Sequence, residues 1–330
     1  MNKKRIPNLT EVVFMTSKAA AGAAVQAKRR PEWVKLMKRN KALYVFLLPA
    51  VIYLAIFNYA PMFGIQIAFR DFTPAGGVWG SPWVGLKYFQ KFFTSYSFWT
   101  LLKNTLTLSL YQLLITFPFP IILALVLNYC PSQRFKKITQ TVTYIPHFLS
   151  VVVLVGMLFI FFSPGTGIVN NIIRSLGGNP IDFLGDPDLF PHMFVWSAAW
   201  QTTGWSSIIY VSSLSGVSPE IHEAAIVDGA NKLQRIWNID IPSILPTIIT
   251  LLILNSGRIM SIGYEKVYLM QSAGNLSTSE IISTHVYKIG IQGAQYSYAS
   301  AIGLFNNIVN MILIITVNKI SDKLTGAGLW

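Results

Sequence analysis

Residues 43–63 read LYVFLLPAVIYLAIFNYAPMF, a run of 21 residues that contains no charged side chain. An α-helix needs about 20 mostly apolar residues to cross the hydrocarbon core of a bilayer. Five further stretches are comparable in length and character: 102–127, 142–162, 192–215, 243–263 and 299–319. The sequence therefore predicts an all-α membrane protein with six transmembrane helices.

The composition of the whole chain agrees with a membrane protein. Its mean hydropathy is +0.48, and only 12% of its residues are charged, against about 25% in soluble domains. The fourth and fifth stretches carry more polar residues than the others, so we expect these two helices to face protein or water rather than lipid. The polar residues in question are Gln201, Thr202, Thr203, Ser206, Asn255 and Arg258.

The distribution of Lys and Arg predicts which ends of the helices face the cytoplasm, because cytoplasmic flanks accumulate these residues. With the N-terminus inside, 18 of the 26 Lys and Arg lie in inside segments. This bias accounts for most of the net charge of +13, so the charge does not imply a nucleic-acid partner. We expect both termini in the cytoplasm, with a basic segment at 1–41 that includes Lys28-Arg29-Arg30, a six-helix domain at 42–320 and a tail at 321–330.

Three longer loops are predicted on the outside, at 64–101, 163–191 and 264–298. The first is rich in Trp, Tyr and Phe, which collect at membrane interfaces, and we interpret it as an interfacial or re-entrant cap. The second contains a short amphipathic piece at 168–176 between two Gly-rich and Pro-rich turns. These loops present the polar and aromatic side chains that a ligand arriving from outside meets first.

The loop between the fourth and fifth stretches contains Glu223-Ala-Ala-Ile-Val-Asp-Gly-Ala230. Ser218 and Pro219 are helix-start signals, and Gly229 is a helix-stop signal, so we predict a short helix over 221–227. A second helix is predicted over 231–238, before Pro242 and Pro246 lead into the fifth span. Small alanines allow a partner to approach, and a carboxylate offers a charge-assisted hydrogen bond. We interpret this helix as a docking element; a generic interfacial helix is the alternative.

This loop resembles the EAA loop of the permease subunits of bacterial ABC importers, in which a Gly and a downstream hydrophobic-x-hydrophobic-Pro, here Ile239-x-Ile241-Pro242, follow Glu-Ala-Ala. The resemblance extends over almost the whole chain from about residue 40. Several further stretches are similar to the permeases that import acidic or complex oligosaccharides, such as aldouronate and alginate fragments. They are PWVGLKYF at 82–89, Asn104-Thr105, FKKITQTVTYIPH at 135–147, NPIDFLG at 179–185 and QYSYASA at 295–301.

The resemblance implies a type I ABC importer permease fold in a bacterial plasma (inner) membrane. It implies a second homologous permease, two ATP-binding subunits, an extracytoplasmic solute-binding protein and an oligosaccharide substrate. It also implies that one set of residues couples this chain to the ATPase: Glu223, Ala224, Ala225, Asp228, Gly229, Ala230 and Pro242. The sequence contains no Gly-x-x-x-x-Gly-Lys-Ser/Thr motif, so we expect ATP and Mg on partner subunits, and no cofactor or enzymatic site in this chain.

Candidates for the sugar path are polar or aromatic residues in the later spans: Gln201, Trp205, Tyr210, Asn255, Arg258, Asn306, Asn307 and Asn310. Arg258 stands out because an ionised side chain within a span is costly, and its paired N–H donors suit a uronate carboxylate. Its alternatives are snorkelling towards the interface, or an ion pair with Glu265 or with a partner subunit. For the other polar residues, the alternative is hydrogen bonding between helices.

Two other classes of protein compete with this interpretation. An ion-coupled secondary sugar transporter typically places ionisable residues within its spans, yet no Asp or Glu lies well inside any of the six stretches. A membrane-embedded enzyme needs a catalytic constellation, and the four histidines, at 147, 192, 222 and 285, have no metal-ligand spacing. Cys130 is the single cysteine, so no intrachain disulfide is possible.

Overall fold

The computed structural model describes residues 39–326, 328 and 329, apart from the side chain of Leu324. The basic cluster Lys28-Arg29-Arg30 and most of the segment predicted at 1–41 lie outside these residues. The chain divides into two units, 1–64 and 65–330, which are described separately.

The first unit contains the first predicted span. Helix α3 (Lys41–Leu54) is followed by a π-helical turn, Ala55–Tyr59, and by a 3-10 segment, Ala60–Phe69, that runs on into the second unit. Together they form one apolar helix of 29 residues, which is long enough to cross a bilayer. The changes of helix type have a local cause, because Pro61 removes a backbone donor from the helical ladder where they occur.

The second unit supplies three further helices that are long and apolar enough to cross. Helices α6 (Phe98–Thr116) and α7 (Pro118–Asn128) form one span of 31 residues. The second span joins α13 (Lys232–Arg235), a π-helical turn (Ile236–Asp240) and α14 (Ile241–Ser256). The third is α18 (Tyr296–Thr325), which passes the end of the predicted stretch and stops at Gly326 in the left-handed conformation.

The fourth predicted span is a single helix, α11 (Phe190–Ser215), of 26 residues. At 1.5 Å per residue it is about 39 Å long, which exceeds the thickness of the hydrocarbon core. Because of its polar residues, α11 is not among the helices whose composition is apolar enough to cross a membrane. It lies at the centre of the second unit and packs against α6, α7, α8 and α14, so it faces protein as expected.

The prediction of one continuous third span at 142–162 was wrong. Helix α8 (Gln133–Tyr144) and a 3-10 turn (Ile145–Phe148) are followed by α9 (Val151–Phe162), and the two parts are bent by 100°. The backbone is extended at Leu149 and Ser150, and the Ser150 hydroxyl accepts a hydrogen bond from the Val153 N–H to start α9. An N-cap therefore divides an apolar run that hydropathy alone treats as one segment.

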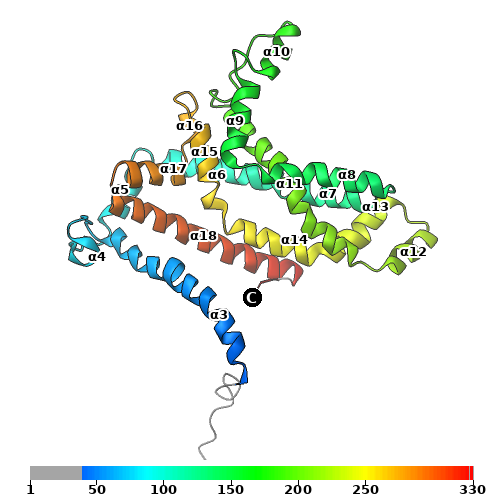
Figure 1. Ribbon diagram of the computed structural model, residues 1–330, viewed down its shortest axis with the longest axis horizontal. Helices are drawn as coiled ribbons and strands as arrows, with labels where there is room; N and C mark the ends of the chain where they lie inside the picture. Colours follow the sequence, from blue (N-terminus) through cyan, green and yellow to red (C-terminus); the bar gives the residue numbers. More distant parts are fainter. Residues whose placement is uncertain (1–38, 327, 330) are drawn as a thin grey trace, which may run out of the picture. The chain divides into compact units, whose positions relative to one another are not determined.

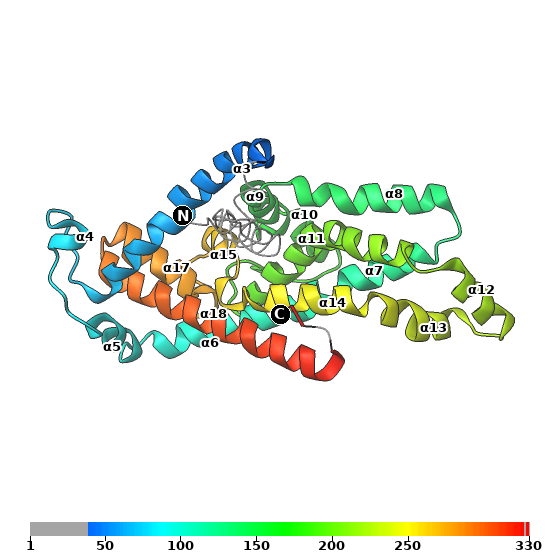
Figure 2. The ribbon, with the colours of Figure 1, turned by 90° about the horizontal axis from the view of Figure 1, so that it is seen from below.

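The long helices α6, α7, α11, α14 and α18 run side by side in the second unit (Figure 1). Helix α8 lies along α11, as Figure 2 also shows. One end of this bundle carries α12 (Pro219–Val227) and α13, and the opposite end carries α5 (Lys87–Phe93) and α17 (Ile282–Tyr287). The other short helices are α4 (Gly77–Gly80), α10 (Ile168–Ser175), α15 (Tyr264–Met270) and α16 (Leu276–Ser279).

Within the described residues the fold contains no β-strand, only one isolated antiparallel bridge between Arg70 and Trp83. The short amphipathic piece at 168–176 is a helix, α10. The apolar core of the second unit forms three clusters, and α11 contributes to two of them, through Phe190 and Phe194 at one end and Tyr210 and Leu214 at the other.

Candidate functional site

Helix α12 confirms the short helix predicted around Glu223-Ala-Ala. It begins at Pro219 after an extended Ser218, whose hydroxyl donates to the Glu220 carboxylate (3.1 Å) instead of accepting from the backbone. Gly229 ends it with a φ of +80°. The N–H of Gly229 donates to Ile226 and the N–H of Ala230 donates to Ala225, which is the pattern of a Schellman motif. A left-handed residue is required there, and glycine adopts that conformation without strain.

Most side chains of α12 are exposed. Glu223 and Ala224 are exposed and Ala225 is partly exposed, while Asp228 and Gly229 lie on the surface at its end. Apolar side chains of α12 are exposed too, namely Ile221, Ile226 and Val227, with Val227 87% exposed. Apolar residues grouped on a short helix at one end of a protein indicate a protein-binding surface. Pro242 lies apart from α12, at the start of α14.

The fifth span ends earlier than predicted, and this changes the position of Arg258. Helix α14 stops at Ser256, and Arg258 precedes a 3-10 turn at Ile259–Ser261. Arg258 is therefore at a break in the helix rather than within a span, contrary to the prediction. Within the described residues its guanidinium has no hydrogen bond and no ion pair, with Glu265 or with any other acid.

Arg258 lines a polar pocket of about 200 Å³ between the break and helix α6. Asn255 lines it too, so two of the predicted path residues meet here. Helix α6 contributes Ser109, Gln112 and Thr116, which the sequence analysis missed. Their spacing of three and four residues places them on one helical face, and this polar face within an apolar span is the signal that could have found them. The Gln112 Oε1 is buried and has no hydrogen-bond partner in the described residues.

Two of the predicted asparagines hold the break against α18. The Asn310 Oδ1 accepts a hydrogen bond from the Met260 N–H (2.9 Å). The Nδ2 groups of Asn310 and Asn306 both donate to the Ser261 hydroxyl, at 2.8 and 3.3 Å. From α6, the Ser109 hydroxyl donates to the Ile259 carbonyl. The bonds to the Met260 N–H and the Ile259 carbonyl satisfy backbone groups at the break, as non-helical backbone within a membrane protein requires.

A second and larger pocket, of about 670 Å³, lies between α15, α17 and α18. Its walls carry Tyr264, Tyr287 and Tyr296, together with Asn306 and the exposed Asn307. The rings of Tyr264 and Tyr287 lie 5.5 Å apart. Ser261 lines both pockets, so they are neighbours on either side of the break. A concave surface with aromatic faces and a few polar groups is typical of a small-molecule site.

The remaining path candidates make packing contacts elsewhere. The Gln201 Nε2 donates to the Leu149 carbonyl (2.9 Å), at the bend between α8 and α9. Trp205 stacks on the His147 ring at the same bend, with ring centroids 4.5 Å apart. Tyr210 is buried in the core between α7, α11 and α14. The structure therefore does not bring these three residues to the pockets beside Arg258.

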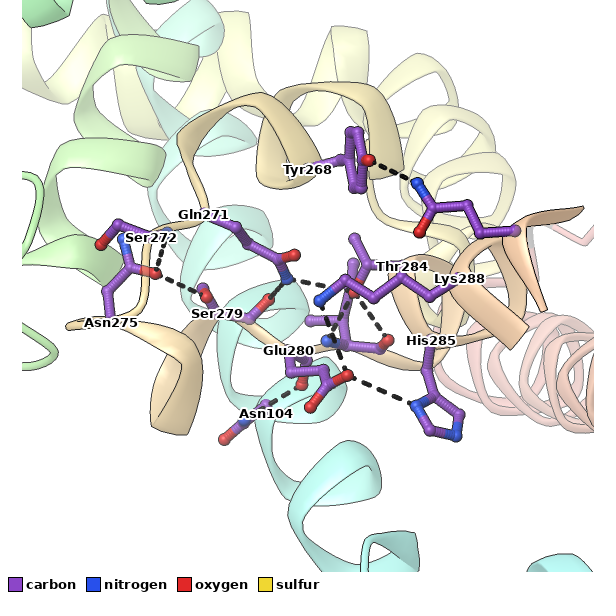
Figure 3. A network of polar contacts seen from close by, with 12 residues as sticks. Asn104, Tyr268, Gln271, Ser272, Asn275, Ser279, Glu280, Thr284, His285 and Lys288 are labelled. Carbon is purple, nitrogen blue, oxygen red and sulfur yellow. Dashed lines mark hydrogen bonds and ion pairs between the residues drawn. The ribbon is translucent and has the colours of Figure 1, made fainter. Parts of the chain in front are cut away.

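A polar network fixes the loop 264–298 over the end of α6 (Figure 3). The Asn104 Nδ2 of α6 donates to the Ser277 and Glu280 carbonyls (2.9 and 3.0 Å), and the Gln271 Nε2 donates to the Ser279 carbonyl (2.8 Å). The Glu280 carboxylate lies 3.4 Å from the His285 ring. The hydrogen bond from His285 keeps the pKa of Glu280 below its usual value, despite partial burial. The helices that form the larger pocket are thus held in place by buried side chains.

These features define a class: a helical membrane subunit with an exposed short helix at one end and polar pockets at a break between its helices. The chain belongs to the family described as binding-protein-dependent transport system inner membrane component, whose profile matches residues 116–324.

Two curated relatives and one solved structure extend this assignment. Protein LplB of Bacillus subtilis (strain 168) is 45% identical, over 90% of this chain and 94% of its own length. The polygalacturonan/rhamnogalacturonan transport system permease protein YteP of the same organism is 42% identical, over 92% of this chain and 94% of its own length. A chain from the crystal structure of a bacterial ABC transporter that imports the acidic polysaccharide alginate aligns with a TM-score of 0.83 at 38% identity, covering 89% of this chain and 100% of that one.

The comparisons confirm several of the sequence predictions. The protein is a permease subunit of an ABC importer with the type I permease fold, an inner-membrane component that depends on a binding protein. Its family consists of transport subunits rather than enzymes, and an ion-coupled transporter is not favoured.

Proposed function

We propose that this permease imports an acidic, uronate-containing oligosaccharide, such as an alginate or aldouronate fragment. It forms half of the translocation pathway, a second homologous permease forms the other half, and an extracytoplasmic binding protein delivers the sugar. Two separate subunits bind ATP and Mg. The observation that carries the proposal is Arg258, an unpaired cation in a polar pocket beside the break after α14.

The chemistry of this pocket suits a uronate. A guanidinium donates two parallel N–H bonds to a carboxylate, and this geometry distinguishes carboxylates from hydroxyl groups. Gln112, Asn255 and Ser109 add further polar groups to the lining of this pocket. The relatives support the same class of sugar, since one is named for polygalacturonan and rhamnogalacturonan transport, and the aligned structure belongs to an alginate importer.

Replacing Arg258 tests the proposed substrate class. In the reconstituted importer, Arg258→Gln should lower the uptake of a uronate oligomer about tenfold, the usual value of a charge-assisted hydrogen bond, and that of a neutral oligomer much less. Arg258→Lys keeps the charge and should retain part of the acidic-sugar uptake. Radiolabelled uptake into proteoliposomes measures both. Equal losses for acidic and neutral sugars would assign Arg258 to structure and remove the main support for an acidic substrate.

The proposal also assigns α12 to the ATPase. Glu223, Ala224 and Ala225 enter a cleft of the ATP-binding subunit, and Asp228, Gly229, Ala230 and Pro242 shape the loop around them. The support is the exposed surface of α12, where small side chains allow close approach and Glu223 is free to accept hydrogen bonds. This surface then faces the cytoplasm, as do both termini.

Adding bulk to α12 tests this contact. Ala225→Trp should reduce both sugar uptake and the stimulation of ATP hydrolysis by the loaded binding protein, because the helix no longer fits its cleft. Glu223→Gln keeps the size of the side chain and should reduce both because it removes the carboxylate charge. The amount of protein inserted in the membrane should not change, since Glu223 is exposed and Ala225 is partly exposed. The coupling assignment is wrong if uptake and stimulated hydrolysis both survive a combined change of Glu223 and Gly229.

A further inference from the structure

Three elements meet behind α12 in a buried polar cluster that the docking surface does not include. Asp240, at the entry to α14, has no exposed surface. Its Oδ2 accepts a hydrogen bond from the Tyr129 hydroxyl (2.6 Å), at the end of α7. Its Oδ1 lies 3.3 Å from the His222 Nε2, on α12. We name Tyr129, His222, Arg235 and Asp240 the junction cluster; the Arg235 guanidinium lies 5.4 Å from the centre of the Tyr129 ring.

Some polar atoms of the junction cluster have no hydrogen-bond partner among the described residues. The contact between His222 and Asp240 is within ion-pair distance but is not aligned as a hydrogen bond, and the Asp240 Oδ1 has no hydrogen-bond partner in the described residues. The Arg235 Nε is likewise buried without a partner. Burial and the bond to Asp240 raise the pKa of Tyr129 to about 12, so its hydroxyl stays a neutral donor. A buried carboxylate is costly unless it is paired, so a small movement of α12 that aligns His222 with Asp240 changes the energy of the cluster.

The connections of the cluster lead to the pocket at Arg258. Asp240 directly precedes α14, a continuous helix of 16 residues, or about 24 Å, whose last turn carries Asn255. Tyr129 caps the span formed by α6 and α7, and α6 lines the other wall of the same pocket. His222 is the member that lies on α12 itself. A displacement of α12 therefore reaches both walls of the pocket through one buried carboxylate.

From this geometry we infer that His222 and Asp240, with Tyr129, form the joint through which a displacement of α12 moves the α6–α7 and α14 spans. They are positioning residues: they touch neither ATP nor sugar. The inference rests on the proposed docking of α12 on an ATPase, and it adds the residues that carry the movement inward. An anchor that merely holds α12 in place is the competing role, and its loss would impair assembly rather than coupling.

The test uses the complete importer in proteoliposomes, with the variants His222→Gln, Asp240→Asn, Tyr129→Phe and the double change of His222 and Asp240. Each single variant should assemble and hydrolyse ATP, yet transport at least about threefold less sugar per ATP. The double variant should be no worse than the single ones, because contacting residues are not additive. Lys87→Gln, which breaks an exposed ion pair with Asp71 (3.2 Å) at the opposite end of the bundle, is the control and should keep the normal ratio.

A second readout follows the movement directly. Cys130 is the only cysteine of the chain and neighbours Tyr129, so the rate at which a maleimide labels it reports on the end of α7. That rate should change on adding ATP and vanadate in the native importer, and the change should be lost in His222→Gln, whose side chain is 20% exposed and tolerant of replacement.

The outcomes separate this inference from the proposed docking. The inferred role of His222 and Asp240 is wrong if both His222→Gln and Asp240→Asn transport the normal amount of sugar per ATP. It is also wrong if the losses in the double variant are additive, or if the single variants fail to assemble. If Ala225→Trp still uncouples the importer in that case, the docking of α12 stands and only the joint fails. If Ala225→Trp has no effect either, the docking itself is wrong.

Discussion

Asn306, Asn307 and Asn310 are the same residue type on one helix, but their surroundings differ. Asn310 and Asn306 are buried and bonded to the break after α14, whereas Asn307 is exposed at the wall of the larger pocket. The sequence indicated that polar side chains in these spans matter, but not which of them bind backbone and which face a cavity. That distinction depends on where α14 ends, at Ser256, before a Gly257-Arg258 pair that the sequence predicts as part of a continuous span.

The three asparagines allow a matched stability test. Asn310→Ala leaves the buried Met260 N–H without an acceptor and should lower the free energy of unfolding by about 1–3 kcal/mol. Asn307→Ala removes no hydrogen bond found among the described residues and should change it by less than about 0.5 kcal/mol. Thermal unfolding of the two purified variants in detergent measures the difference. Equal midpoints would contradict the role of Asn310 as the bond that holds the break.

At the scale of elements, the bend between α8 and α9 shows what a hydropathy profile does not contain. The stretch 142–162 has the length and apolar character of a span, and such a profile counts residues without recording direction. The bend depends on Ser150, a local N-cap that the sequence does contain, and on contacts from α11 that it does not reveal. The α12 loop was predictable because all of its signals, Pro219 and Gly229 among them, are local.

The packing of α8 on α11 gives a prediction for this element pair. A Cβ at Gly204 would lie 2.0 Å from the Thr143 carbonyl oxygen, so Gly204→Ala should force the helices apart and destabilise the protein by about 1–3 kcal/mol. The control is Gly156→Ala in α9, where a Cβ would meet nothing within 4 Å; it should be neutral or slightly stabilising, since Ala favours helix. Thermal unfolding in detergent compares them, and a harmless Gly204→Ala would mean that the two helices are not in close contact.

At the scale of the whole molecule, the class of protein could be predicted from composition, and the family from the loop at 223–230. Both predictions use properties that can be read without knowing the fold, namely the length of the apolar segments and a motif with fixed spacing. The pockets could not be predicted in this way. Their walls combine α6, α14 and α18, which are distant in the sequence, and Gln112 became a candidate only when the structure placed it opposite Arg258.

The Lys and Arg bias predicts the orientation of the molecule in the membrane, and the single cysteine can test this prediction. Cys130 follows the end of the α7 span, which we place at the cytoplasmic side together with α12. A membrane-impermeant maleimide should therefore label the chain in inside-out vesicles and leave it unlabelled in intact cells or spheroplasts. Cys130→Ser is the control for background labelling. The reverse labelling pattern would mean that the predicted topology is inverted and that α12 lies outside.

The bend beside Ser150 also has a consequence for how the protein is made. The carbonyl of Leu149 receives its hydrogen bond from Gln201, which is synthesised 52 residues later. Until α11 arrives, a bent backbone in lipid would leave that carbonyl unpaired, at a cost of several kcal/mol. The contact that completes the bend can therefore form only after translation has passed Gln201.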